Sequence, residues 1–168
     1  MRLRTPLAAT TLLTLAVAAA APAQTADQTF TGKRAGKVKI GKTFRSLRDA
    51  GRLGPQRPGC ELAGPGQRSA RLKAPLRGFA ELTTGTPRRV RNIALRGGAT
   101  ARGVGVGSTI AQIRAAFAGA RVDRSTEGTF GLTLVKVSKA AGGRFQFAVD
   151  VDSGRTTLVG IPVVRFCE

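Results

Sequence analysis

Two stretches of this chain repeat one another at a constant spacing of 66 residues, and this duplication constrains the fold more than any other feature. Identical or similar residues coincide at Val38/Val104, Ile40/Val106, Gly41/Gly107, Thr43/Thr109, Phe44/Ile110, Leu47/Ile113, Arg48/Arg114 and Ala50/Ala116. Such a duplication predicts two copies of one structural unit. In each copy we expect an extended lead-in, a glycine turn and a short helix. Thr43 and Thr109 are the predicted N-caps, and Gln112 completes a capping box with Thr109.

The downstream part of each copy has the pattern of two strands joined by a tight turn. We align Phe79, Val90 and Ile93 of the first copy with Phe147, Leu158 and Ile161 of the second. Apolar and polar residues alternate over 145–152, and residues 152–154 suit a hairpin turn. Residues 129–138 supply the strand before this hairpin. Residues 51–67 are rich in Gly and Pro and predict a loop.

The N-terminal residues 1–23 have the features of a secretory signal peptide. Arg2 and Arg4 precede an apolar stretch, and small residues precede the predicted cleavage after Ala23. Residues 24–35 are polar and predict a mobile leader. No later stretch approaches the length of a membrane span. We therefore expect an exported protein, extracellular or in the cell envelope, which is soluble after removal of the signal peptide.

The two cysteines, Cys60 and Cys167, both follow the predicted cleavage site. An even pair in an oxidising compartment predicts a disulfide, and the alternative is two buried free thiols. The predicted fold class is therefore α+β, with two tandem units at residues 36–98 and 99–168. Each unit has a short helix packed on a small antiparallel β-meander, and one disulfide joins the two.

The repeated pattern V-x-[IV]-G-x-T, followed by a meander, resembles the tandem units of secreted β-lactamase inhibitory proteins and of small outer-membrane-assembly lipoproteins. A closer resemblance is to exported bacterial proteins with two such units. In that group the second unit opens with T-x-x-G-[IV]-x-[IV]-G-[SD], which residues 100–108 match, and cysteines stand where Cys60 and Cys167 do. The resemblance implies the two-unit architecture. It also implies a protein partner, because the inhibitory proteins bind their enzymes with a concave face.

The composition excludes most familiar hydrolases. The sequence has no histidine, which excludes His-dependent triads and His-ligated metal sites. Residues 36–43 match the P-loop pattern G-x-x-x-x-G-K-T, but no buried strand precedes them, so nucleotide binding is a remote alternative. Asp150 and Asp152 share one strand face, where a solvated surface is the simpler interpretation than a cation site. We expect no enzyme activity, no metal and no cofactor.

The positive charge is concentrated in the first repeat. Residues 24–98 hold 17 basic and 4 acidic residues, a net charge of +13, whereas residues 99–168 have a net charge of +4. Such a surface attracts polyanions. The candidate anion-binding residues are Lys37, Lys39, Lys42, Arg45, Arg48, Arg52, Arg88, Arg89 and Arg91. The alternative is that the charge reflects composition and serves solubility alone.

These observations predict a non-enzymatic binding or envelope-associated protein. The first hypothesis is a protein partner, bound through the surface between the repeats. The alternative is electrostatic binding of an anionic envelope polymer or a membrane surface by the first repeat. We do not expect sequence-specific binding of nucleic acid, because the eight Phe residues mostly occupy core positions and the chain has no Tyr or Trp.

Overall fold

The computed structural model describes residues 26–60, 64–138 and 142–166. The predicted signal peptide, residues 1–23, lies outside the described residues, and so does Cys167. The Sγ atom of Cys60 lies 3.8 Å from the carbonyl oxygen of Phe166. No disulfide joins two described residues, and the predicted pairing with Cys167 is not part of the fold described below.

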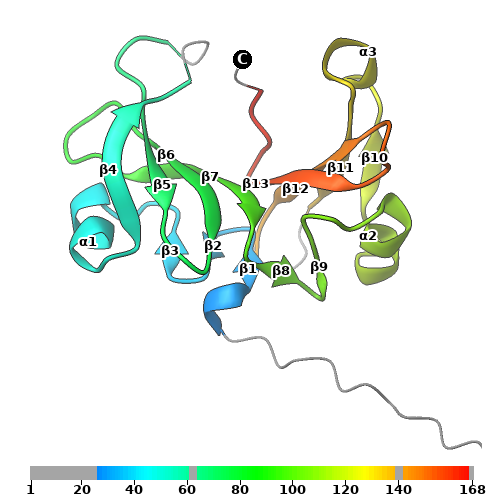
Figure 1. Cartoon of the computed structure of the whole chain (residues 1–168), viewed down its shortest axis with the longest axis horizontal. Helices are drawn as coiled ribbons and strands as arrows, with labels where there is room; N and C mark the ends of the chain where they lie inside the picture. The colour runs from blue at the N-terminus through cyan, green and yellow to red at the C-terminus, as the bar shows by residue number, and fades with distance from the viewer. Residues whose placement is uncertain (1–25, 61–63, 139–141, 167–168) are drawn as a thin grey trace, which may run out of the picture.

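One antiparallel sheet of eight strands runs through the molecule (Figure 1). From one edge to the other the strands are β10 (Arg121–Asp123), β11 (Leu132–Val137), β12 (Phe145–Asp150), β13 (Thr156–Ile161), β7 (Val90–Gly97), β6 (Arg77–Leu82), β5 (Arg68–Leu72) and β4 (Leu53–Pro58). We call β4–β7 the first half of the sheet and β10–β13 the second half. The ladder between β7 and β13 joins them.

The two halves are related by an approximate twofold axis that passes between β7 and β13. Ala94 pairs with Gly160, which lies 66 positions later in the chain. The flanking pairs are Ile93/Ile161 and Leu95/Val159. Each copy of the repeat therefore supplies one half of the sheet, and equivalent residues meet at the centre.

The short hairpins and the two capped helices lie on one side of the sheet, the lower side in Figure 1. They are η1 (Ala26–Gln28), β1 (Phe30–Thr31), β2 (Arg34–Ala35), β3 (Val38–Lys39), α1 (Phe44–Asp49), β8 (Thr100–Ala101), β9 (Val104–Gly105) and α2 (Ile110–Ala116). Their apolar side chains form one core with the sheet. We call this side the covered face and the other side the open face. The helix α3 (Glu127–Phe130) rises beyond the sheet on the side of the open face.

The predicted repeat of the lead-in and helix is visible in the structure. The elements β2, β3 and α1 begin 66 residues before β8, β9 and α2. Thr43 accepts a hydrogen bond from the backbone N–H of Ser46, and Thr109 forms the predicted capping box with Gln112. Both N-cap predictions are therefore confirmed.

The two glycine turns are held by the same contacts in each copy. Gly41 (φ 84°) and Gly107 (φ 92°) have the left-handed backbone that favours glycine. Each donates its N–H over 2.7 Å, to the carbonyl oxygen of Val90 and of Thr156 respectively. The arginine side chains that donate to the carbonyl oxygens of the two glycines are also equivalent: they are Arg89, at 2.9 Å, and Arg155, at 3.0 Å.

The prediction of an α+β fold with two separate small meanders is wrong. The structure is mostly β, with about 45% strand and 15% helix, and one sheet takes strands from both repeats. An isolated meander would leave β7 and β13 as unpaired edges, and their pairing removes both edges. Among the described residues this ladder, and not a disulfide, connects the two repeats.

The segment predicted to be a mobile leader instead packs into the core over Phe30–Ala35. Phe30 is 2% exposed, and its ring meets the rings of Phe145 and Phe147 edge-on at centroid distances of 5.3 and 6.1 Å. A lone aromatic residue in a polar segment gave no periodic signal for this packing.

The loop predicted over residues 51–67 contains the edge strand β4. Pro55 and Pro58 lie within it, and proline is tolerated on an edge strand because it lacks only a donor that no neighbour requires. Gly and Pro, which usually indicate a loop, here occur in a strand.

The alignment of Phe79 with Phe147 is also wrong by one residue. In the ladders, Ala80 pairs with Ile93 as Phe147 pairs with Val159, so Ala80 is the equivalent of Phe147. A shift of one residue moves a side chain to the opposite face. Phe79 therefore lies on the open face, while Phe147 is buried in the core.

Replacing Phe30 by alanine tests the packing of the N-terminal segment. We expect Phe30→Ala to lower the free energy of unfolding by about 3–5 kcal/mol, because it removes a buried ring. Urea unfolding followed by circular dichroism measures this. The exposed neighbour Lys33 provides the control, and Lys33→Ala should change stability by about 0.5 kcal/mol or less. Equal stability of the two variants would show that the segment does not pack as described.

Candidate anion-binding site

Six of the nine predicted anion-binding residues already have partners within the described chain. Two ion pairs are with Asp27, and the others involve separate groups. The contacts are Lys37–Asp27 (3.4 Å), Arg52–Asp27 (3.7 Å), Arg45–Asp49 (3.9 Å), Arg91–Glu81 (3.5 Å), Arg88 to the side chain of Gln56 (2.5 Å) and Arg89 to the carbonyl oxygen of Gly41 (2.9 Å). The predicted group is therefore largely used in holding the fold, and only Lys39, Lys42 and Arg48 have no such partner among the described residues.

Residues 36–43 do not form a phosphate-binding loop. Val38–Lys39 is a strand, and α1 has six residues. The backbone N–H groups that a P-loop would direct at phosphate donate instead within the protein. The N–H groups of Gly36, Ile40, Gly41 and Lys42 bond to the carbonyl oxygens of Thr29, Lys33, Val90 and Lys39. The sequence match thus arises from a hairpin and a turn.

Asp150 belongs to the hairpin turn after β12. Its carboxylate accepts hydrogen bonds from the hydroxyl (2.6 Å) and the backbone N–H (2.9 Å) of Ser153. These bonds, the hydroxyl first, lower the pKa of Asp150 below its ordinary value. The described residues contain no group of three or more His, Cys, Asp or Glu that would hold a metal ion.

A different set of basic residues gathers on the open face of the first half of the sheet. Alternation along β5 places Ala70 and Leu72 in the core, so Ser69 and Arg71 point to the open face. Across the ladders Arg57 lies opposite Ser69, and Phe79 lies opposite Arg71. Four strands thus contribute side chains to one surface.

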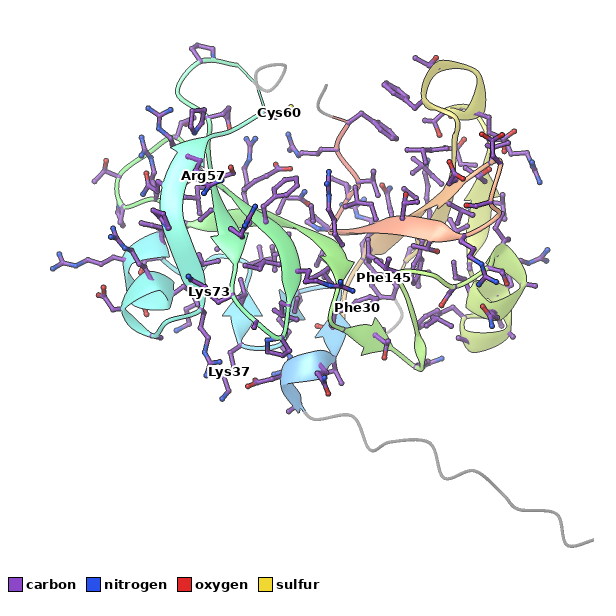
Figure 2. The ribbon with its side chains drawn as sticks, viewed as in Figure 1. Phe30, Lys37, Arg57, Cys60, Lys73 and Phe145 are labelled. Atoms are coloured by element: carbon purple, nitrogen blue, oxygen red, sulfur yellow. The ribbon has the colours of Figure 1, made fainter. Side chains whose placement is uncertain are left out.

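This surface is hollowed, with a volume of about 620 Å³. We call it the arginine hollow, and its polar and aromatic lining is Arg57, Ser69, Arg71, Arg77, Phe79 and Arg96. Leu72 and Leu76 also line it, but both are buried and expose little surface there. Figure 2 shows Arg57 well apart from Lys37 and Lys73, which lie toward the lower, covered side.

No carboxylate of the described residues neutralises the four arginines of the hollow. None of the seven ion pairs in the described chain includes Arg57, Arg71, Arg77 or Arg96. The hydroxyl of Ser69 donates to the carbonyl oxygen of Pro58 at 3.1 Å and brings no charge. The hollow therefore combines several guanidinium groups with the half-buried ring of Phe79, and its lining has no acidic side chain.

Two of the equivalent positions in the second half hold opposite charges that neutralise each other. The ladders make Asp123 the counterpart of Arg57, and Lys136 the counterpart of Arg71. The ammonium group of Lys136 donates to the carboxylate of Asp123. Where the second half holds an acid–base pair, the first half holds two arginines.

The open face of the second half is apolar and covered. Leu134 and Ala148 are buried beneath Val164, and Leu158 and Phe166 pack against them. The ring of Phe166 also stacks on that of Phe130 in α3, with centroids 4.1 Å apart. The chain's own C-terminal residues therefore shield this half from solvent.

The C-terminal segment, residues 162–166, leaves the end of β13 and rises between the two halves (Figure 1). Its backbone N–H groups donate to side chains of the sheet, Val163 to Asn92 (3.4 Å) and Val164 to Gln146 (2.9 Å). Arg165 forms an ion pair with the buried Glu81 at 3.2 Å. The segment thus holds itself on the open face by side-chain contacts and not as a ninth strand.

The arginine hollow was missed by the sequence analysis. Arg57 lies in the segment predicted to be a loop, and the other three arginines occur singly in strands that were not aligned in register. The alternation Ser69–Ala70–Arg71–Leu72 is the one local signal that places Arg71 opposite the core. Convergence of four strands on one surface requires the sheet order, which no local pattern gives.

A search of protein-family models, curated proteins and solved structures found no match to this chain. Among the described residues no helix has the length and apolar character needed to cross a membrane.

The Asp123–Lys136 pair predicts a measurable dependence of stability on pH. The hydrogen bond from Lys136, and then those from Ser125, hold the pKa of Asp123 well below its ordinary value. A carboxyl with a lowered pKa stabilises the fold above its unfolded pKa of about 3.9, and this stabilisation is lost as the pH falls further. We expect Asp123→Asn to be less stable than wild type at about pH 6, with a difference that narrows toward about pH 3.

Urea unfolding at several pH values measures how the difference in stability between wild type and Asp123→Asn changes with pH. Asp152→Asn is the matched control, because the exposed side chain of Asp152 has no partner among the described residues. A constant difference between wild type and Asp123→Asn from about pH 6 to about pH 3 would contradict the assignment.

Proposed function

We propose that this protein is a non-enzymatic binding protein that holds an anionic partner in the arginine hollow. The observation that carries the proposal is the gathering of Arg57, Arg71, Arg77 and Arg96 around one hollow with no described carboxylate in ion-pair contact. Like charges held close together repel, and an oxyanion bound among them removes that repulsion.

The chemistry of the lining favours binding over catalysis. Guanidinium groups present forked N–H donors that match carboxylate and phosphate oxygens, and they stay charged at all ordinary pH values. The lining has no acidic side chain and no histidine to act as a general base, and the hydroxyl of Ser69 donates to a backbone carbonyl. The hollow therefore has donors for an anion and no group placed to activate one.

The kind of basic residue distinguishes the hollow from a general electrostatic surface. Its basic residues are all arginines, whereas Lys37 and Lys73 lie toward the covered side. Lysine and arginine serve equally well where charge alone is needed, but arginine is preferred where paired oxygens are recognised. We retain the exported location predicted from residues 1–23 as part of the proposal.

Binding of polyglutamate and of inorganic polyphosphate across a salt series tests this function. At about 150 mM salt we expect the double variant Arg71→Ser/Arg96→Ser to lose at least about tenfold in affinity for one of these anions. Each lost charge-assisted hydrogen bond contributes about 1.5–3 kcal/mol, so two arginines suffice for that loss. Fluorescence anisotropy of the labelled anion provides the measurement.

The control variant Arg45→Ser/Arg48→Ser removes the same charge from α1, outside the hollow. We expect it to weaken binding by about twofold or less at the same salt concentration. An equal loss in both variants would favour the alternative, electrostatic binding by overall charge, to which Lys39, Lys42 and Arg48 would contribute. If Arg71→Ser/Arg96→Ser binds the anion as tightly as wild type, the arginine hollow is not the binding site.

A further inference from the structure

We propose that the anionic group which occupies the arginine hollow belongs to an extended acidic segment of a partner protein. This inference rests on the proposed function and adds the class of ligand to it. Three observations support it: how the chain's own C-terminal segment lies on the open face, how the two halves differ at equivalent positions, and what lies between the arginines.

The open face already holds one extended segment. Along residues 164–166 the side chains alternate in direction, as they do in extended chain. Val164 and Phe166 pack on the apolar second half, whereas Arg165 reaches the buried Glu81 of the first half. The open face thus receives extended chain through side-chain contacts, with its backbone held by Asn92 and Gln146.

The twofold relation shows what an occupant of the first half requires. Beneath the C-terminal segment the second half presents Leu134, Ala148 and Leu158. The ladders make their counterparts in the first half Ser69, Glu81 and Asn92. Glu81 and Asn92 already bond to Arg165 and to the backbone N–H of Val163. The part of the first half that is left for another occupant is therefore the arginine hollow, which requires a polar segment.

The charge of that polar segment follows from the counterpart pairs. Asp123 neutralises Lys136 in the second half, but Arg57 stands where an acid would neutralise Arg71. A carboxylate from outside the chain would supply the missing charge. In an extended segment alternate side chains face the same way, about 6–7 Å apart, so several carboxylates are able to face the hollow together.

The aromatic residue between the arginines favours a peptide over a phosphate polymer. Phe79 lies opposite Arg71 on the ladder and is half-buried, so part of its ring faces the hollow. A peptide brings apolar side chains that such a surface shields from water, and a hydrated polyphosphate brings none. Arginine and aromatic residues together are also typical of the central part of protein interfaces.

Two peptides of the same composition distinguish recognition of an extended segment from attraction by net charge alone. In Glu-Ser-Glu-Ser-Leu-Ser-Glu-Ser-Glu every carboxylate and the leucine face one side of an extended chain. In Ser-Ser-Glu-Glu-Leu-Glu-Glu-Ser-Ser the carboxylates point to both sides. We expect the first peptide to bind at least about tenfold more tightly at about 150 mM salt, measured by isothermal titration calorimetry with the full mature chain.

Variants of the protein test whether the preference for the first peptide depends on the arginine hollow. Arg71→Ser/Arg96→Ser should abolish the difference between the peptides, while Arg45→Ser/Arg48→Ser should keep it. Phe79→Ala should weaken the alternating peptide about fivefold but leave unchanged a version in which serine replaces its leucine. The melting temperature of each variant, compared with that of wild type, shows whether the variant is folded. If the double variant Arg71→Ser/Arg96→Ser is not folded, the single variants Arg71→Ser and Arg96→Ser are used in its place.

The outcomes distinguish this inference from the function on which it rests. Suppose that the two peptides bind with equal affinity and that Arg71→Ser/Arg96→Ser weakens both. This result would contradict the inference of an extended segment but would still support an anion site in the hollow. Polyphosphate that binds in the hollow more tightly than the alternating peptide would overturn it in the same way. If no anion binds in a manner that the hollow variant changes, the proposed function fails as well.

Discussion

The ladder between β7 and β13 is the constraint on which the rest of the structure depends. It converts two copies of a short helix-and-strand unit into one sheet and places Ala94 against its own counterpart, Gly160. The small size of Gly160 is required there, because a Cβ atom at this position would lie 2.1 Å from the carbonyl oxygen of Val163. The C-terminal segment can turn back over the centre of the sheet only because that side chain is missing. The ladder therefore determines both the joining of the halves and the path of the segment that divides the open face.

The two copies share the contacts that hold the turns and the helices. They differ in the side chains that they place on the open face. The turns at Gly41 and Gly107 use the same backbone bonds, and Arg89 and Arg155 hold them in the same way. Such contacts involve the backbone and a neighbouring strand, so any departure from them would disturb the core beneath. On the open face of the first half the C-terminal segment contacts Glu81 and Asn92, but the arginines of the hollow are exposed. Such exposed side chains are free to differ between the halves without loss of the fold, and this is where the arginine hollow and the apolar surface beneath Val164 diverge.

What could be predicted from the sequence is what depends on neighbours along the chain. The N-caps at Thr43 and Thr109 need only residues three positions away, and both were found. The burial of Phe30 and the strand that contains Pro55 depend on partners far along the chain, and their local composition indicates the opposite. The register of Phe79 failed for a related reason: the turn that joins the paired residues Leu82 and Val90 is one residue longer than the turn that joins Val149 and Thr156, so the spacing between the two copies changes at the turn. The arginine hollow could not be predicted for all of these reasons. Its residues come together only when β4 is recognised as a strand, β6 is placed in the correct register and the order of the four strands is known.

The position of the charge matters more than its amount. Six of the nine basic residues predicted from the density of charge along the chain bond to groups of the chain itself. The four arginines of the hollow were not predicted, and none of them has an ion-pair partner among the described residues. Solubility requires charge somewhere on the surface and is served best when like charges lie apart. Arg57, Arg71, Arg77 and Arg96 are exposed and line one hollow with Phe79, and solubility does not require charges of one sign to gather in this way. The proposed oxyanion would supply a reason for the arrangement, because its negative charge attracts the guanidinium groups of the hollow.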